Sequence, residues 1–282
     1  MNTTRRRFLQ TSMGVAAGWT LHRTLAAQGA AQPPKIPIAV QLYVLRDEFA
    51  RDVPGTLKAV KEAGFQGVEF WGYGGTPNVF QQYSAKQLRR ILDDLGLKCC
   101  GMHISLAALD PARLHTTVEN NQVLGNHFLN VASADEYMRS EEKILSLATL
   151  LNETAKKVRP HKMRVGYHAH PQDFIKIGGR FAWEILFSHA DPEILMQMDV
   201  GNCLAGHGDP VAMLREFPGR TLSIHLKEYE DKTFDSPYYQ EIFHLCETTC
   251  KTQWYIVEME SGPGTGMSRS RAALATLHRL GK

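Results

Sequence analysis

The chain has 282 residues, of which 43% are hydrophobic and 22% charged, and this composition is that of an ordinary globular protein with one large domain or two small ones. The formal net charge is +3, but residues 1–32 carry four arginines and no acidic residue. Without them, 28 basic residues face 29 acidic ones, for a net charge of −1. A charge this small gives no general attraction to nucleic acid, so we expect no nucleic-acid partner.

Residues 1–32 have the layout of a cleaved leader peptide and linker. Basic residues at 5–7 come first, an apolar stretch at 13–21 follows, and small residues occupy 25–30. The sequence Thr-Arg-Arg-Arg-Phe-Leu-Gln at 4–10 is similar to the twin-arginine signal, which exports folded proteins. A disordered basic tail is the alternative. We therefore expect the precursor to use the twin-arginine export machinery and the mature protein to be periplasmic or secreted, without stable membrane association.

From residue 33 onward, strand-like runs alternate regularly with helix-like segments. The predicted strands are 38–43, 67–70, 98–103, 127–132, 163–168, 195–200, 221–225 and 254–258. The predicted helices are 53–63, 84–95, 111–124, 141–158, 181–188, 210–217, 238–250 and 268–280. Eight alternations predict a (β/α)8 TIM barrel over residues 33–282. A doubly wound open sheet is the competitor, but no glycine-rich turn follows the first strand.

Polar residues stand at or just beyond the ends of the predicted strands. The carboxyl ends of barrel strands open onto one face, so side chains far apart in the sequence converge there. The residues in such positions are Glu69, His103, His168, His170, Asp199, His225, Lys227, Glu258 and Glu260. A single histidine or carboxylate is more often structural, but four metal-ligand types ending four consecutive strands favour a metal site.

We predict that His168, Asp199, His225 and Glu258 bind one divalent metal ion. This mixed nitrogen and oxygen set suits Mn²⁺, Co²⁺, Zn²⁺ or Fe²⁺ and leaves positions open for substrate oxygens. His170 would lie on the same strand face as His168, so it is the alternative ligand or a substrate contact. The five cysteines contain no Cys-x-x-Cys pair, and we expect them to be mostly buried small hydrophobic residues.

Six short motifs, in this order, resemble the sugar phosphate isomerase/epimerase superfamily of xylose isomerase-like TIM barrels. They are Val-Gln-Leu-Tyr-Val-Leu-Arg at 40–46, Ala-Gly-Phe-Gln-Gly-Val-Glu at 63–69, Gly-Tyr-His-Ala-His at 166–170, Met-Asp-Val-Gly-Asn at 198–202, His-Leu-Lys-Glu at 225–228 and Val-Glu at 257–258. The resemblance runs from about residue 38 to 280. It implies one divalent metal at the ends of strands five to eight and a small-molecule sugar substrate, and we assign Glu69 and Asn202 to substrate binding.

His168 departs from the pattern of the family's epimerases, which have a glutamate there that pairs with the one at the Glu258 position for two-sided proton transfer. The Tyr-His-x-His variant resembles a branch that includes keto-sugar lyases and dehydratases. We expect an isomerase/epimerase-type enzyme that acts through an enediolate, with a keto-sugar lyase or dehydratase as the alternative. Glu258, His170, Lys227 and His103 are the candidate catalytic residues.

Two other functions remain as weaker alternatives on the same barrel. An apurinic-endonuclease-like hydrolase would need a larger metal cluster and a basic track for DNA. A non-catalytic sugar-binding protein would retain its ligand after losing the metal.

Export is predicted to depend on Arg5 and Arg6, which form the strongest local signal before residue 32. Replacing both with lysine should leave the precursor in the cytoplasm, because the twin-arginine machinery recognises the pair itself. Cell fractionation and immunoblotting measure the outcome. Normal export of the double variant would point to an ordinary secretory leader.

Overall fold

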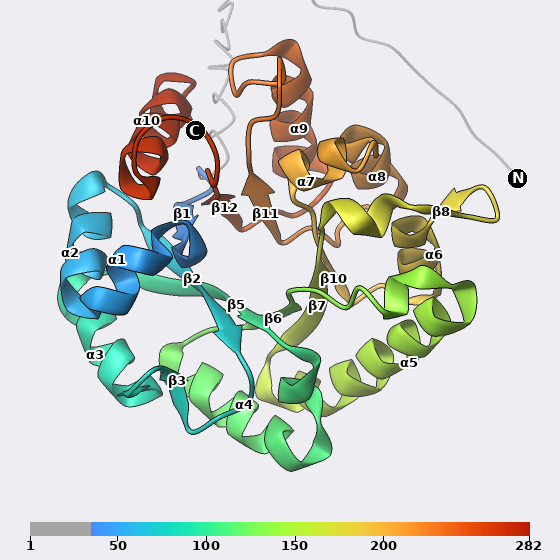
Figure 1. Ribbon diagram of the computed structural model, residues 1–282, viewed down its shortest axis with the longest axis horizontal. Coiled ribbons are helices and arrows are strands. Elements are labelled where there is room, and N and C mark those ends of the chain that lie inside the picture. The colour runs from blue at the N-terminus through green and yellow to red at the C-terminus, as the bar shows by residue number, and fades with distance from the viewer. Residues whose placement is uncertain (1–34) are drawn as a thin grey trace, which may run out of the picture. The chain divides into compact units, whose positions relative to one another are not determined.

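A computed structural model describes residues 35–282, and the leader predicted for residues 1–32 lies outside this range. Eight parallel strands lie at the centre and helices surround them (Figure 1). The strands are β1 Ile38–Gln41, β2 Gly67–Tyr73, β5 Lys98–Ile104, β6 Phe128–Val131, β7 Arg164–His168, β10 Leu195–Gln197, β11 Ser223–Leu226 and β12 Trp254–Val257. Their order is β10-β7-β6-β5-β2-β1-β12-β11, and a parallel bridge between Asp199 and His225 links the two outer strands. The predicted TIM barrel is confirmed.

The outer layer consists of the predicted helices, whose ends follow local sequence signals. They are α2 Val53–Ala63, α3 Ala85–Leu95, α4 Pro111–Leu124, α5 Glu141–Val158, α6 Ala182–His189, α8 Pro210–Glu216, α9 Pro237–Thr248 and α10 Gly266–Arg279. Ser84 and Gln87 form a capping box at the start of α3, and Gly96 ends this helix in the left-handed conformation. These signals fix where a helix starts and stops, whereas burial of one face holds it on the barrel.

Several short elements were not predicted. They are the helices α1 Arg46–Arg51 and α7 Val200–Ala205, the hairpins β3 Asn78–Phe80 with β4 Tyr83–Ser84 and β8 Lys176–Ile177 with β9 Arg180–Phe181, and the 3₁₀ turns η1 Leu42–Leu45, η2 Leu106–Leu109, η3 Tyr137–Arg139, η4 Arg159–His161 and η5 Pro171–Phe174. The predicted strand 195–200 is therefore too long, because β10 ends at Gln197 and Asp199 caps α7 through the backbone N–H of Asn202.

The barrel interior has an apolar layer below a polar one. Ala39, Cys100 and Ile256 form a small apolar cluster of their own. Two residues further along β1, on the same strand face, Gln41 is fully buried and polar. All five cysteines are buried and unpaired, which confirms that they are small core residues. Among the described residues, no helix has the length and apolar character that crossing a membrane requires.

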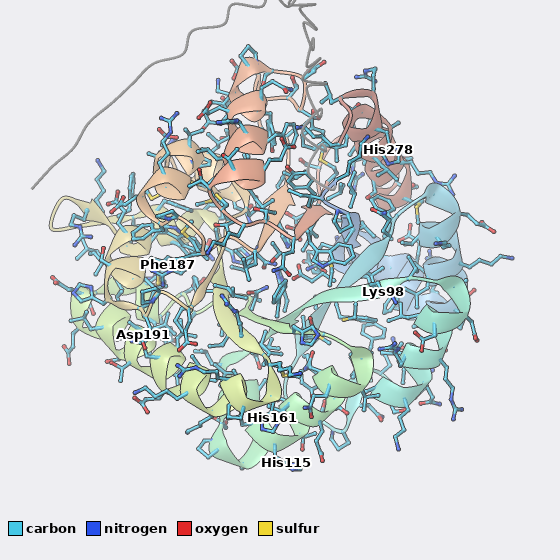
Figure 2. All side chains as sticks on the ribbon, turned by 180° about the vertical axis from the view of Figure 1, so that it is seen from behind. Lys98, His115, His161, Phe187, Asp191 and His278 are labelled. Atoms are coloured by element: carbon cyan, nitrogen blue, oxygen red, sulfur yellow. The ribbon has the colours of Figure 1, made fainter. Side chains whose placement is uncertain are left out.

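Arg220 joins the loop between α6 and β10 to the start of β11 from the amino-terminal side of the barrel. Its guanidinium, in a residue only 6% exposed, donates to the carbonyl oxygens of Phe187 at 2.7 Å, Ala190 at 3.2 Å, Asp191 at 2.8 Å and Ile194 at 3.1 Å. Phe187 and Asp191 are labelled on the left of Figure 2, where the molecule is seen from behind. One side chain therefore donates to four carbonyl groups at the end of α6 and in the loop that follows, of which only that of Asp191 also accepts from a backbone N–H.

Replacing Arg220 with methionine is expected to lower the free energy of unfolding by about 3 kcal/mol or more, because it leaves several buried carbonyls without donors. The control is Arg215→Met on α8, since Arg215 makes an exposed ion pair with Glu241 at 2.7 Å. An exposed pair of this kind contributes about 1 kcal/mol at most. Urea unfolding of both variants gives the comparison, and equal losses would contradict the role given to Arg220.

Candidate active site

A cavity of about 450 Å³ opens at the carboxyl ends of the barrel strands, within the range of ordinary small-molecule sites. Its walls come from the ends of β2, β5 and β7 and from the segments that follow β1, β6, β7, β10 and β12. The lining residues are Tyr43, Trp71, Gly72, His103, Ala132, His168, His170, Pro171, Asn202, Glu258 and Glu260. No lysine or arginine is among them, so the wall offers no cation to a phosphate group.

The four predicted metal ligands lie together beside this cavity. His168 ends β7, His225 lies in β11, and Asp199 and Glu258 follow β10 and β12. Each offers one ligand atom, and these four atoms lie within 4.8 Å of one another. All four residues are buried, so the set forms a closed group of two imidazoles and two carboxylates that could hold a divalent cation.

Glu69 lies fully buried in the barrel interior, next to this group. Its Oε2 accepts from His225 Nε2 at 2.6 Å and from Gln41 Nε2 at 2.9 Å. His103 Nε2 is 3.2 Å away. Burial would raise the pKa of Glu69, but the two imidazole rings hold this pKa well below its usual range. Glu69 therefore stays ionised and orients His225. It does not line the cavity, so the structure places it away from the predicted substrate contact.

Gln197 fixes the proton positions on two histidines. Its Nε2 donates to Glu69 Oε1 at 2.8 Å and to Ser223 Oγ at 3.0 Å. The carboxylate can only accept, so Gln197 Oε1 must face the other way. There it lies 2.8 Å from His103 Nε2 and 3.1 Å from His168 Nδ1. Both nitrogens therefore donate, and Nε2 of His168 is left with a lone pair suited to a metal.

The charges beside the cavity are unbalanced. Burial would lower the pKa of His225, but Glu258 and Glu69 raise this pKa to about 10, so its ring is cationic. The Lys227 ammonium lies 3.1 Å from Asp199 Oδ2, 3.3 Å from Glu258 Oε2 and 2.6 Å from Glu260 Oε2. These carboxylates raise the pKa of Lys227 despite its burial. The three buried carboxylates, Glu69, Asp199 and Glu258, thus face two buried cations, His225 and Lys227.

The partners of the two Asp199 carboxylate oxygens indicate whether a cation fits among the four residues. Asp199 Oδ1 accepts from the backbone N–H of Asn202 at 2.7 Å. Asp199 Oδ2 is buried without a hydrogen bond of regular geometry and has ion-pair contacts with Lys227 Nζ at 3.1 Å and His225 Nδ1 at 3.8 Å. Burial raises the pKa of Asp199 to about 6, in spite of that ammonium. A buried carboxylate oxygen that is short of partners, in a group with excess negative charge, suits a divalent cation.

The remaining predicted residues occupy different places around the cavity. His170 lies on the wall, outside the group of four, and its buried Nδ1 has no partner; burial lowers the pKa of this ring. Asn202 lies on the wall and accepts from Lys227 Nζ at 3.1 Å. Lys227 itself lies among the carboxylates and not on the wall. His103 reaches both the wall and Gln197.

Two kinds of functional residue were missed by the sequence analysis. Gln197 bonds two imidazoles and Gln41 bonds Glu69, and a lone polar residue at the end of an apolar strand was the signal. Tyr43 and Trp71 form an aromatic side of the cavity. Trp71 stands two residues after Glu69 on β2, so strand periodicity placed it on the same face.

Comparison with known proteins agrees with this architecture. The model of the family described as xylose isomerase-like TIM barrel matches residues 57–280. No curated protein matches the chain. A sugar phosphate isomerase/epimerase from Parabacteroides distasonis superposes with a TM-score of 0.76 at 19% identity, over 88% of this chain and 97% of its own. A 3-keto-D-glucoside 4-epimerase from E. coli superposes with a TM-score of 0.66 at 12% identity, over 87% of this chain and 100% of its own. An L-ribulose 3-epimerase superposes with a TM-score of 0.64 at 15% identity, over 87% of this chain and 94% of its own. The chain belongs to the xylose isomerase-like TIM barrel family.

Proposed function

We propose that this protein is a divalent-metal-dependent enzyme that removes a proton beside the carbonyl of a sugar or keto-sugar and isomerises, epimerises or eliminates from the resulting enediolate. The observation that carries the proposal is the convergence of His168, Asp199, His225 and Glu258 beside a cavity at the carboxyl ends of the strands. Residues in this position are catalytic in other enzymes with this barrel. The names of the similar structures, which include two sugar epimerases, are consistent with it.

The metal is proposed to be Mn²⁺, Co²⁺, Zn²⁺ or Fe²⁺. When bound, such a cation stabilises negative charge that develops on substrate oxygens. The chain prepares the site for it in two ways. Glu69 and Gln197 orient the rings of His225 and His168, and the protonated Lys227 limits repulsion between Asp199 and Glu258.

His170 is proposed to carry the proton. Its ring forms part of the cavity wall, and its Nδ1 is buried without a protein partner, so Nε2 is the nitrogen that would face a bound sugar. In the step, the bond between hydrogen and the carbon next to the carbonyl breaks, the proton passes to His170, and the electron pair forms the double bond of an enediolate. Return of the proton to the former carbonyl carbon, with the hydroxyl proton passing from one enediolate oxygen to the other, gives an isomer. Departure of a leaving group from the next carbon gives an unsaturated product.

Elimination is a second candidate because of the residue at position 168. A two-base epimerase needs a second proton carrier on the opposite side of the substrate, and His168 is bonded through Nδ1 to Gln197 and faces the metal ligands. This arrangement favours a keto-sugar lyase or dehydratase over a simple epimerase. The wall without lysine or arginine argues against a DNA substrate.

We also propose that the enzyme acts outside the cytoplasm. The pattern of paired arginines at 4–10 supports this location, and export after folding would allow the metal to be inserted beforehand.

Replacing one ligand should remove the metal without unfolding the barrel. We expect Asp199→Ala and His225→Ala to bind the metal at least about 100-fold more weakly, more than the roughly 10- to 100-fold typical of residues that only support a ligand. Elemental analysis after gel filtration measures occupancy, and far-ultraviolet circular dichroism should stay nearly unchanged.

Asp209→Ala is the matched control for Asp199→Ala. Asp209 caps the neighbouring helix α8 through the N–H groups of Val211 and Ala212, as Asp199 caps α7. Loss of a cap costs about 1 kcal/mol in either variant, but only Asp199→Ala should lose metal. Full occupancy in both ligand variants would refute the assignment of the metal site.

The proposed chemistry predicts deuterium uptake from solvent. Metal-loaded protein incubated in D₂O with keto-sugars should place deuterium on one carbon beside the carbonyl, because an enediolate exchanges its proton even when turnover is slow. His170→Gln should slow the exchange by about 100-fold or more, the usual contribution of a proton carrier, while metal occupancy stays unchanged. Mass spectrometry and proton NMR follow the exchange.

His161→Gln is the control for the histidine substitution. His161 is exposed in the turn before β7 and is labelled near the bottom of Figure 2, in the view from behind. The His161→Gln variant should take up deuterium into the keto-sugar at the wild-type rate. Binding of a sugar without any exchange would favour the non-catalytic alternative. Clean epimerisation that is lost in Glu258→Gln but survives in variants of His170, His103 and Lys227 would show that the glutamate, and not His170, moves the proton.

A further inference from the structure

A second cavity adjoins the candidate active site and shares one wall with it. It measures about 560 Å³ and is lined by Trp71, Gly72 and residues 76–81. Trp71 and Gly72 also line the 450 Å³ cavity beside the metal ligands. Each cavity alone lies within the range of about 300 to 1,000 Å³ that accommodates a whole small ligand. The two together provide more room than one sugar ring requires.

The wall that the two cavities share has open space at Gly72. Gly72 has a φ of 73°, and a Cβ added there would meet no atom within 4 Å. Only a residue without a side chain therefore keeps this point of the wall both unstrained and clear. No side chain separates the two cavities at this point.

Trp71 gives this wall a rigid flat surface. Its ring packs against Phe80 at a centroid distance of 5.1 Å, against the fully buried Phe49 at 5.6 Å and against Tyr43 at 6.1 Å. The indole is only partly covered by these neighbours. An aromatic face of this kind suits the C–H face of a sugar ring, which is apolar, while hydroxyl groups at the ring edge remain free for hydrogen bonds.

The segment that lines the second cavity is held in place by hydrogen bonds within the protein, so the cavity exists before any ligand binds. Asn120 on α4 donates to the carbonyls of Thr76 and Pro77 at 3.0 and 3.2 Å, and Tyr73 Oη donates to Thr76 O at 3.0 Å. The β3–β4 hairpin completes the loop. A loop that is anchored in this way loses little entropy when a ligand binds.

The side chains that line the second cavity carry no charge. Thr76, Asn78 and Gln81 offer neutral polar groups, and Val79 and Phe80 offer apolar ones. The second cavity therefore does not match a phosphate or a nucleotide, which proteins bind with cationic groups. The chemistry fits a neutral saccharide.

We propose that the second cavity binds the second unit of a neutral disaccharide or glycoside whose first unit reacts beside the metal site, with Trp71 between the two units. The inference rests on the proposed function and narrows its substrate class. The substrate is then a keto-glycoside and not a free or phosphorylated monosaccharide.

The test compares saccharides of one and two units in a variant that fills only the second cavity. Asn78→Trp places a bulky ring there without changing the first cavity. Calorimetry with cellobiose and maltose, against glucose, measures binding, and exchange in D₂O with keto-glucose and the keto-disaccharides measures reactivity. The wild-type protein should prefer the disaccharides by about tenfold or more, and Asn78→Trp should remove the preference while leaving glucose unaffected.

Gln82→Trp is the matched control, because Gln82 is exposed in the same hairpin and lines neither cavity. It should behave as the wild type. Trp71→Leu is a second variant, chosen to retain apolar bulk without the flat face, and should weaken the disaccharides more than glucose. Circular dichroism checks folding in all three.

The inference and the proposed function fail in different ways. Equal affinity for one- and two-unit sugars, no saccharide binding, or a preference that survives in Asn78→Trp would overturn the second subsite. Exchange into keto-glucose in that same experiment would leave the proposed function standing. Absence of exchange in every keto-sugar would overturn the proposed function instead.

Discussion

The buried carboxylate of Glu69 is the interaction on which the candidate site depends. A fully buried anion is stable in a barrel only if donors surround it, and Glu69 receives them from three other strands, through Gln41, Gln197 and His225. The neighbouring strand makes room for it, because a Cβ at Gly101 would lie 2.1 Å from Glu69 Oε1. The Glu69 carboxylate thereby fixes the orientation of side chains on β1, β10 and β11.

The hydrogen bonds that stabilise buried Glu69 also set which nitrogens of the neighbouring histidines carry protons. Because Gln197 must donate to Glu69, its carbonyl faces His103 and His168 and sets which nitrogen of each ring carries a proton. His225 must likewise donate from Nε2, so Nδ1 is the nitrogen that faces Asp199 and Glu258. A metal ligand must present an unprotonated nitrogen, so a bound cation would replace the proton on Nδ1 of His225, and the ring orientation that this requires is already set by Glu69 and Gln197.

The sequence predicted the barrel and the convergence of four residues of metal-ligand type, because both depend on local signals. Strand and helix patterns repeat eight times, and His168, Asp199, His225 and Glu258 each stand at a strand end. The roles of Glu69 and Lys227 could not be predicted in the same way. Whether such a side chain faces the cavity or lies beneath it depends on the stagger between strands, which is set by closure of the whole barrel. The end of β10 at Gln197, earlier than predicted, also depends on the closed barrel, since Asp199 caps α7, a helix that barrel closure positions after β10.

The site therefore consists of two parts that respond differently to substitution. The charged group is buried and mutually dependent, so removing one member leaves another buried charge without its partner and costs more than the lost contact. The other part is Trp71 near the end of β2 together with the segment that follows this strand, which is anchored to Asn120 on α4 through the carbonyls of Thr76 and Pro77 and on which Asn78 is exposed. Substitutions on this segment leave the charges undisturbed. Under the proposed function, the length of the saccharide would thus be selected independently of the proton transfer, a division that the barrel permits because the charged group and the segment after β2 belong to different parts of it.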